Sequence, residues 1–200
     1  MMRFRILRQL LVFSAILPLS GCLEIGGTSS PSRFYLLEPL AVVSDGAGDR
    51  ELGLGVGPIR APGYLDRPQI VTRSTDNQIQ LAEFDRWGEP LRESVSRVLA
   101  ANLGRLLGTE RVQRHPWRAS RDVEIAVEVD VERFDGERGG SVVLDVNWRL
   151  RSDGAPVQRA AHIVEETRGG DYADLAAAMS RALARLSTEM AAAVSSVRQP

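Results

Sequence analysis

The side chains that most often act as nucleophiles, general bases or metal ligands are scarce in this 200-residue sequence. Cys22 is the only cysteine, which excludes an internal disulfide and any metal site built from several cysteines. The two histidines, His115 and His162, share no motif, and the absence of lysine excludes Schiff-base chemistry. Walker A, HExxH and GxSxG sequences are also missing. We therefore expect no enzyme activity, no metal ion and no cofactor.

The residues before Cys22 indicate what its sulfur does. The first eight residues carry three arginines, residues 10–19 are almost entirely apolar, and the sequence Leu19-Ser20-Gly21-Cys22 follows. This order is typical of a cleaved secretory signal, and the apolar stretch is shorter than the ~20 residues of a membrane-spanning helix. The segment resembles a bacterial lipoprotein signal. That resemblance implies a diacylglycerol thioether on Cys22, cleavage before it, and an N-acyl chain on the new terminus.

The sequence thus predicts a signal peptide at residues 1–21, a lipidated flexible tether at residues 22–32 and one folded domain at residues 33–200. Cleavage removes three arginines and no acid from the 25 basic and 26 acidic residues, which leaves a net charge of −4. Lipid rather than charge must then hold the chain at a membrane. Because the basic residues are scattered among acids, we expect no nucleic-acid binding.

The hydrophobic pattern predicts an α/β fold with a single domain, in which a mixed, largely antiparallel sheet packs against two principal amphipathic helices. Helical spacing indicates helices over residues 90–108 and from Asp171 onward, with fraying from Ser195. Residues 84–91 are expected to form a loop that leads into the first helix. Strands are predicted at residues 33–37, 52–59, 69–73, 78–83, 122–132, 142–150 and 157–167, the last three as an antiparallel meander.

Two features of these strands allow a structural and a functional interpretation. Gly53, Gly55 and Gly57 could be mistaken for a phosphate-binding loop. Pro58 follows them and no helix begins there, so we expect a glycine-lined strand in close backbone contact. The acidic side of strand 122–132 is expected to be a solvated face, with a partner surface for arginines as the alternative.

Four short segments carry a resemblance to a known family. They are residues 34–37 (FYLL), 56–58 (VGP), 64–73 (YLDRPQIVTR) and 86–91 (RWGEPL), of which the decapeptide is the most specific. Together with the lipoprotein signal they resemble the PqiC family, also called the ABC-type transport auxiliary lipoprotein component. The family more often has alanine where Gly88 stands.

The resemblance implies a non-enzymatic lipoprotein in the inner leaflet of the outer membrane, facing the periplasm. Leu23, which follows the cysteine in place of aspartate, implies the same membrane by the sorting rule of enteric bacteria. The implied partners are an MCE-domain tunnel protein, its inner-membrane transporter components, and further copies of the chain in a ring. Docking or aligning the tunnel at the outer membrane would contribute to envelope integrity.

The two polar and aromatic stretches, residues 57–73 and 84–91, are candidates for the surface that meets a partner or another copy. Tyrosine and arginine are favoured at interfaces, although both stretches could equally serve the fold alone. The candidate surface residues are Tyr64, Leu65, Asp66, Arg67, Gln69, Arg73, Trp87 and Glu89.

Two rival functions stay open at this point. One is a structural envelope lipoprotein that stands alone, without a transporter partner. The other is a periplasmic hydrolase, although no sequence motif supplies the nucleophile and the base that it would need.

Overall fold

The structure is a computed structural model that describes residues 30–41, 50–118 and 120–198. All its described helices and strands lie in the compact unit Ser32–Pro200. The predicted signal peptide, Cys22 and residues 23–29 of the predicted tether lie outside the described residues.

The larger sheet has five strands in the order β5-β2-β6-β7-β8. As predicted, β6 (Ile125–Gly136), β7 (Ser141–Arg151) and β8 (Val157–Glu166) form an antiparallel meander. β2 (Leu54–Arg60) pairs in parallel with β6 on one side and with β5 (Val112–Arg114) on the other. The period-2 alternation of β6 and β7 places their leucines, Trp148 and all their valines except Val143 on the face that the helices cover.

A second sheet corrects the expectation of a single one. It has three strands in the order β1-β4-β3, with β1 (Arg33–Tyr35) parallel to β4 (Gln78–Trp87) and β3 (Gln69–Thr75) antiparallel to β4. The predicted hairpin is confirmed, but the expected loop at residues 84–91 is wrong over its first half. β4 continues to Trp87 because both residues are buried: Asp85 accepts a hydrogen bond from Tyr35 of β1, and Trp87 packs in the hydrophobic core.

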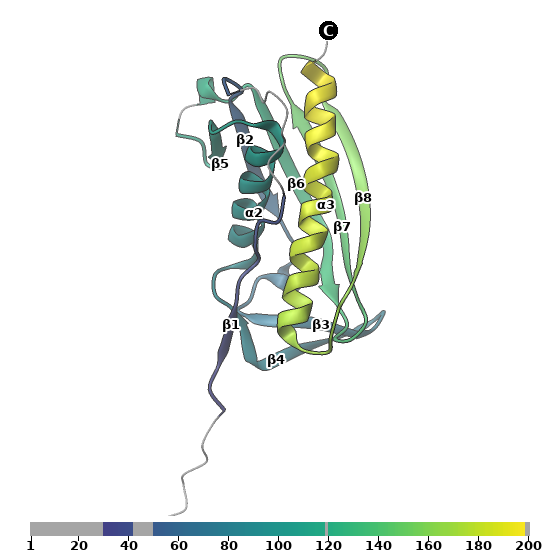
Figure 1. The fold of residues 1–200 in the computed structure, drawn as a ribbon. Helices are drawn as coiled ribbons and strands as arrows, with labels where there is room; N and C mark the ends of the chain where they lie inside the picture. The colour runs from purple at the N-terminus through teal and green to yellow at the C-terminus, as the bar shows by residue number, and fades with distance from the viewer. Residues whose placement is uncertain (1–29, 42–49, 119, 199–200) are drawn as a thin grey trace, which may run out of the picture. The chain divides into compact units, whose positions relative to one another are not determined.

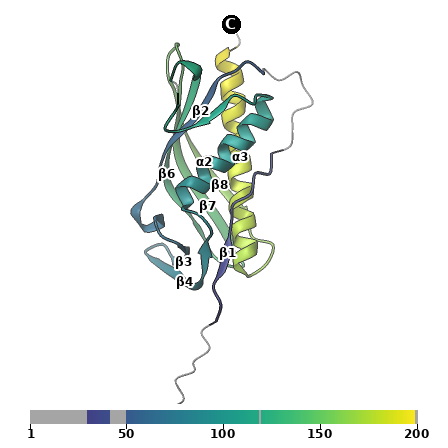
Figure 2. The same cartoon turned by 90° about the vertical axis from the view of Figure 1, so that its left-hand side faces the viewer.

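Both helices lie on one face of the five-stranded sheet (Figures 1 and 2). α2 (Leu91–Leu107) follows Pro90 and ends at Gly108, which is left-handed with φ 66° and donates its amide hydrogen within the closing turn, as the sequence predicts. α3 (Tyr172–Arg198) passes the expected fraying point at Ser195, because Val194 is fully buried and Val197 still packs on the core. Neither described helix is long and apolar enough to cross a membrane.

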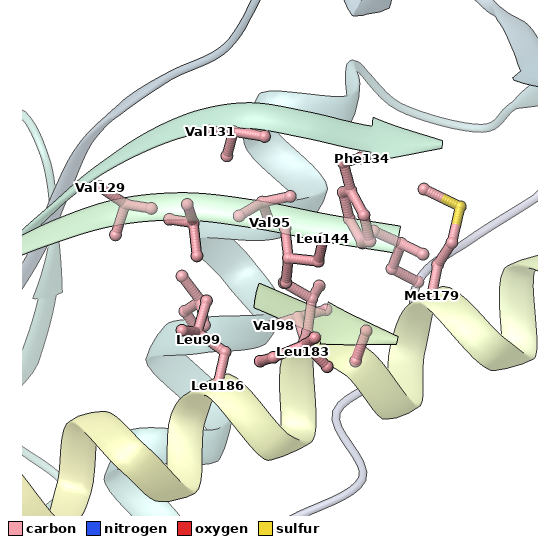
Figure 3. Close-up of a cluster of buried hydrophobic side chains, with 14 of the residues drawn as sticks. Val95, Val98, Leu99, Val129, Val131, Phe134, Leu144, Met179, Leu183 and Leu186 are labelled. Carbon is pink, nitrogen blue, oxygen red and sulfur yellow. The ribbon is translucent and has the colours of Figure 1, made fainter. Parts of the chain in front are cut away.

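One hydrophobic cluster joins both helices and both sheets. Figure 3 shows Val98 of α2 close to Leu183 of α3, and Leu99 of α2 close to Leu186 of α3. Phe134 of β6 and Met179 of α3 extend the cluster toward the three-stranded sheet, where Trp87 joins it. Each such side chain contributes roughly 1.5–3 kcal/mol when fully buried. The confirmed fold class is therefore a mixed α/β domain with two helices and open sheets.

The glycines in and directly before β2 lie in close backbone contact, as predicted. A Cβ atom on Gly53 would collide with the carbonyl of Asp122, and one on Gly55 would lie 2.7 Å from the Val123 side chain. Gly57 has φ +111°, a conformation that other residues rarely adopt. These three positions let β2 pass close to the neighbouring segments.

The extended segment 36–41 runs beside the two helices after β1 (Figure 2). Leu37 is fully buried, and its carbonyl accepts a hydrogen bond from Arg97 at 2.8 Å. The amide of Ala41 donates to Asn102 at 3.0 Å, and Asn102, itself buried on α2, also bonds Ser187 of α3. The segment is thus part of the packed domain.

Candidate functional site

Residues 57–73, which contain most of the candidate surface, lead from β2 into β3. The Gly57–Pro58 peptide bond is cis, and a single 3-10 turn, η1 (Gly63–Leu65), follows. The carbonyl of Pro62 closes this turn by accepting from the amide of Leu65 at 3.0 Å. Leu65 points into the core, whereas the half-buried Tyr64 turns toward the end of β6.

Tyr64 and Arg73 meet on Asp135, a fully buried carboxylate of β6. The hydroxyl of Tyr64 donates to Oδ2 at 2.8 Å, and Arg73 donates from Nε at 2.9 Å and from Nη2 at 2.7 Å. Arg133 adds a fourth hydrogen bond at 2.9 Å. We call these four residues the Asp135 clamp. It connects the η1 turn and β3 of the three-stranded sheet to β6 of the five-stranded sheet.

The clamp sets the charge of its members. Burial alone opposes ionisation of Asp135, but the hydrogen bonds from Arg73, Tyr64 and Arg133 outweigh it and lower the pKa of the carboxyl. Burial and the hydrogen bond to Asp135 raise the pKa of Tyr64 to about 12. The tyrosine is therefore neutral and donates, while the carboxylate is charged and accepts.

A second clamp holds β1 on β4. Asp85 is almost completely buried and accepts from Tyr35 at 2.6 Å and from Arg33 at 2.8 Å and 3.0 Å. Burial raises the pKa of Tyr35 to about 12, and the hydrogen bond to Asp85 acts in the same direction. Tyr35 also lies against Tyr172 at the start of α3, with ring centroids 6.5 Å apart. We call Arg33, Tyr35 and Asp85 the Asp85 clamp.

The remaining candidate residues divide into buried and exposed ones. Trp87 is buried like Leu65, and the carboxylate of Glu89 accepts from Ser94 and Arg97 at the start of α2. Burial alone would raise the pKa of Glu89, but these two hydrogen bonds outweigh it, so the pKa is lowered. Asp66 is exposed and pairs with Arg92 at 3.0 Å, whereas Arg67 and Gln69 are half-buried.

Sequence reasoning missed Asp85, Asp135, Arg33 and Tyr35 as parts of polar clusters. Because the register of β6 shifts between Val131 and Arg133, Asp135 lies on the strand face opposite Phe134, and it is nevertheless fully buried. Arg133 is two positions away, but Tyr64 and Arg73 lie 71 and 62 positions away in the chain, and no spacing rule connects them to Asp135.

The acidic side of β6 engages arginines of this same molecule. Glu128 lies within ion-pair distance of Arg149 and Arg151 of β7, and Asp130 pairs with Arg60 of β2 at 3.1 Å. Within the described ranges, no three histidine, aspartate, glutamate or cysteine side chains come together as a metal site.

Comparison with known proteins identifies the family of this chain. The sequence profile of the ABC-type transport auxiliary lipoprotein component family matches residues 35–191. The chain belongs to this family. The matched region includes the Asp135 clamp and all of the Asp85 clamp except Arg33. The family consists of transport auxiliary lipoproteins and not of enzymes.

Individual relatives agree with the family. The intermembrane transport lipoprotein PqiC of Escherichia coli is 26% identical over 153 residues, which cover 76% of this chain and 79% of the relative. The corresponding protein of Shigella flexneri shows the same identity and coverage. The chain is thus a PqiC-like auxiliary lipoprotein of ABC-type transport.

Solved structures share the fold. A crystal structure of a Xanthomonas campestris protein has a TM-score of 0.68 at 18% identity, covering 82% of this chain and 94% of that one. A second crystal structure has a TM-score of 0.69 at 22% identity, with 82% and 99% covered.

Proposed function

We propose that the chain is a lipoprotein held by Cys22 in the inner leaflet of the outer membrane, facing the periplasm. There it acts as an accessory subunit of an MCE-type intermembrane lipid transport system and contributes to envelope integrity. The observation that carries the proposal is the family match over residues 35–191. The name of the E. coli relative, an intermembrane transport lipoprotein, supports the same role.

The sequence before the domain supports the anchor. The residues Leu19-Ser20-Gly21-Cys22 fit a lipoprotein processing site, with residues 1–21 removed and residues 22–32 serving as the tether. The two acyl chains of the diacylglycerol and the N-acyl chain on Cys22 would together supply three acyl chains, where a single one gives marginal binding.

Docking, rather than chemistry, is the proposed work of the domain. An MCE-domain tunnel protein and its inner-membrane transporter components are the proposed partners, and several copies of the chain are proposed to form a ring. Of the candidate surface residues, Tyr64, Leu65, Arg73, Trp87 and Glu89 hold the fold. Asp66, together with its ion-pair partner Arg92, is the exposed part that we propose for contact with the protein partner.

Affinity purification of the full-length tagged chain from cross-linked cells in mild detergent tests the partnership, with mass spectrometry of the recovered proteins and lipids. Recovery of an MCE-domain protein is the expected result. Recovery of an acylated chain without such a partner, from cells that express one, would instead favour the stand-alone structural envelope lipoprotein.

The anchor is tested by Cys22→Ala, with Ser29→Ala as the matched control in the tether. We expect the Cys22→Ala chain to lack acyl chains and to leave the outer-membrane fraction, while Ser29→Ala stays with the wild type. Retention of the Cys22→Ala chain in that fraction would contradict the proposed anchor.

A further inference from the structure

The three-stranded sheet turns one face away from the core. On β4, Asp85 and Trp87 are buried, so Arg86 between them points to the opposite side. The strand register places Phe34 of β1 and Gln69 of β3 on the two sides of Arg86. Phe34 is 67% exposed, the largest value among the exposed large hydrophobic residues of the described chain.

A second row lies next to the first. Leu36 and Gly88 directly follow β1 and β4, and Arg67 lies two residues before β3. The hydrogen bonds from Gly88 to the carbonyl of Tyr35 at 2.8 Å and from Trp87 to that of Pro68 at 2.7 Å fix the backbones there. A Cβ atom on Gly88 would lie 3.0 Å from Leu36, which is 49% exposed and occupies that space.

We call the side chains of Phe34, Leu36, Arg67 and Arg86 the tether-side face. Its two arginines lack partners among the described residues: the Nε of each is buried without a hydrogen bond, and neither guanidinium is in an ion pair. Arg73 and Arg97, by contrast, are fully engaged with carboxylates nearby. A guanidinium with a buried stem and an unpaired fork suits an external phosphate, which it can bind through two parallel hydrogen bonds.

We propose that the tether-side face docks on the membrane that holds the chain, with the arginines on phospholipid phosphates and Phe34 and Leu36 among the headgroups. This inference rests on the proposed anchor at Cys22. Phe34 is twelve residues beyond Cys22 in the sequence, and that length of chain spans at most about 40 Å. The anchor would therefore keep the face close to the bilayer at all times.

The mixture of groups favours a lipid surface over a protein partner. Exposed aromatic and aliphatic side chains beside arginines are characteristic of segments that lie in the membrane interface. The chain without residues 1–21 carries a net charge of −4, so its surface as a whole is not drawn to anionic headgroups. An orientation with this face toward the membrane brings Arg67 and Arg86, which have no acidic partner in the described part of the chain, to the phosphates.

The test uses the full acylated chain in vesicles of phosphatidylethanolamine and phosphatidylglycerol with brominated acyl chains. Bromine quenches indole fluorescence only at close range. In a Trp117→Phe background, which removes the half-buried third tryptophan, the Phe34→Trp variant therefore reports insertion against Trp87 and Trp148, which are buried. We expect clear additional quenching in Phe34→Trp. Leu36→Trp supplies a second position, and circular dichroism verifies that each variant is folded.

The arginines are tested in the same variant by adding Arg67→Gln and Arg86→Gln. Each loss should lower the ratio of docked to undocked molecules about fivefold, because a cation at an anionic leaflet contributes about 1 kcal/mol. Arg118→Gln with Arg121→Gln is the matched control, since both residues are exposed and lie between β5 and β6. An equal effect of the control pair would overturn the assignment to Arg67 and Arg86.

The outcomes separate this inference from the proposed function. An acylated chain that floats with the vesicles but shows no added quenching leaves the anchor intact and overturns the docked face. A chain without acyl chains on Cys22 overturns both. Protection of the introduced indole only after an MCE-domain protein is added would make the face a protein interface, and the membrane assignment would be wrong.

Discussion

Asp135 and Asp85 occupy the same kind of environment in different sheets. Each is a buried carboxylate that accepts from one tyrosine hydroxyl and from at least one arginine. Burial of an unpaired carboxylate is costly, so each side chain requires the whole set of donors. The partners lie on different elements, and each aspartate therefore fixes the position of a strand or turn that has few other polar connections.

At the residue scale we predict that Asp135→Asn destabilises the protein by about 3–5 kcal/mol, because two guanidinium groups lose the charge that offsets their burial. The control is Asp130→Asn, whose pair with Arg60 is exposed and contributes about 0–1 kcal/mol. Urea unfolding followed by circular dichroism measures both. An equal decrease in the free energy of unfolding of the two variants would show that the Asp135 clamp stabilises the fold no more than an exposed ion pair does.

The raised pKa values of the two clamp tyrosines predict that the stability of the protein falls at alkaline pH. An ordinary tyrosine titrates near pH 10, whereas Tyr35 and Tyr64 have pKa values raised to about 12. Since the folded pKa lies above the unfolded one, their contribution to stability is complete below about pH 10 and is lost as the pH rises toward 12. In a near-ultraviolet absorbance titration, Tyr64→Phe should remove one late-ionising group and leave the earlier part of the curve unchanged.

Single residues show where sequence reasoning ends. Gly108 and the β2 glycines were predictable because their roles are local: a helix end and a crowded strand. Tyr64 and Arg73 were recognised as unusual, yet their common partner Asp135 was not, because the contact depends on how two sheets meet. Whether any of the candidate surface residues binds a partner is not decided by the fold and stays a prediction.

At the scale of elements, β2 depends on its glycines. Gly53→Ala should destabilise the protein by about 1–3 kcal/mol, because the new Cβ would collide with the backbone of Asp122 and the connection to β6 must shift. Gly63→Ala is the matched control: nothing lies within 4 Å of its Cβ position, and we expect a change within about 0.5 kcal/mol. Thermal or urea midpoints would show the difference, and a tolerated Gly53→Ala would mean that β2 has room to move.

Element prediction succeeded where a pattern was long. The alternation through β6 and β7 and the apolar stripes of α2 and α3 each repeat many times, which makes a chance pattern improbable. β5 has only three residues, too few for a period, although it pairs with β2 and its Val112 packs on the core. The polar residues Asp85 and Arg86 do not indicate a strand at the end of β4, but Asp85 is buried there by its clamp.

At the scale of the whole domain, the two sheets share one hydrophobic cluster, so we predict a single cooperative unfolding transition. Trp87 reports on the three-stranded sheet and Trp148 on the five-stranded sheet. In a Trp117→Phe background, Trp148→Phe and Trp87→Phe isolate each signal in turn. Their urea midpoints, corrected for the stability of each variant by circular dichroism, should coincide. Separate transitions would mean that the small sheet unfolds independently.

The parallel pairing of β1 with β4 has a mechanical consequence. Tension that enters the domain at Ser32 pulls along the axis of β1, so its bonds to β4 are loaded in shear and must fail together instead of peeling apart one by one. The ion pair between Arg33 and Asp85 and the buried side chain of Leu37 lie on the same load path. A domain joined to its tether in this way resists extraction by a force directed along the chain, and its weakest direction is sideways, across β1.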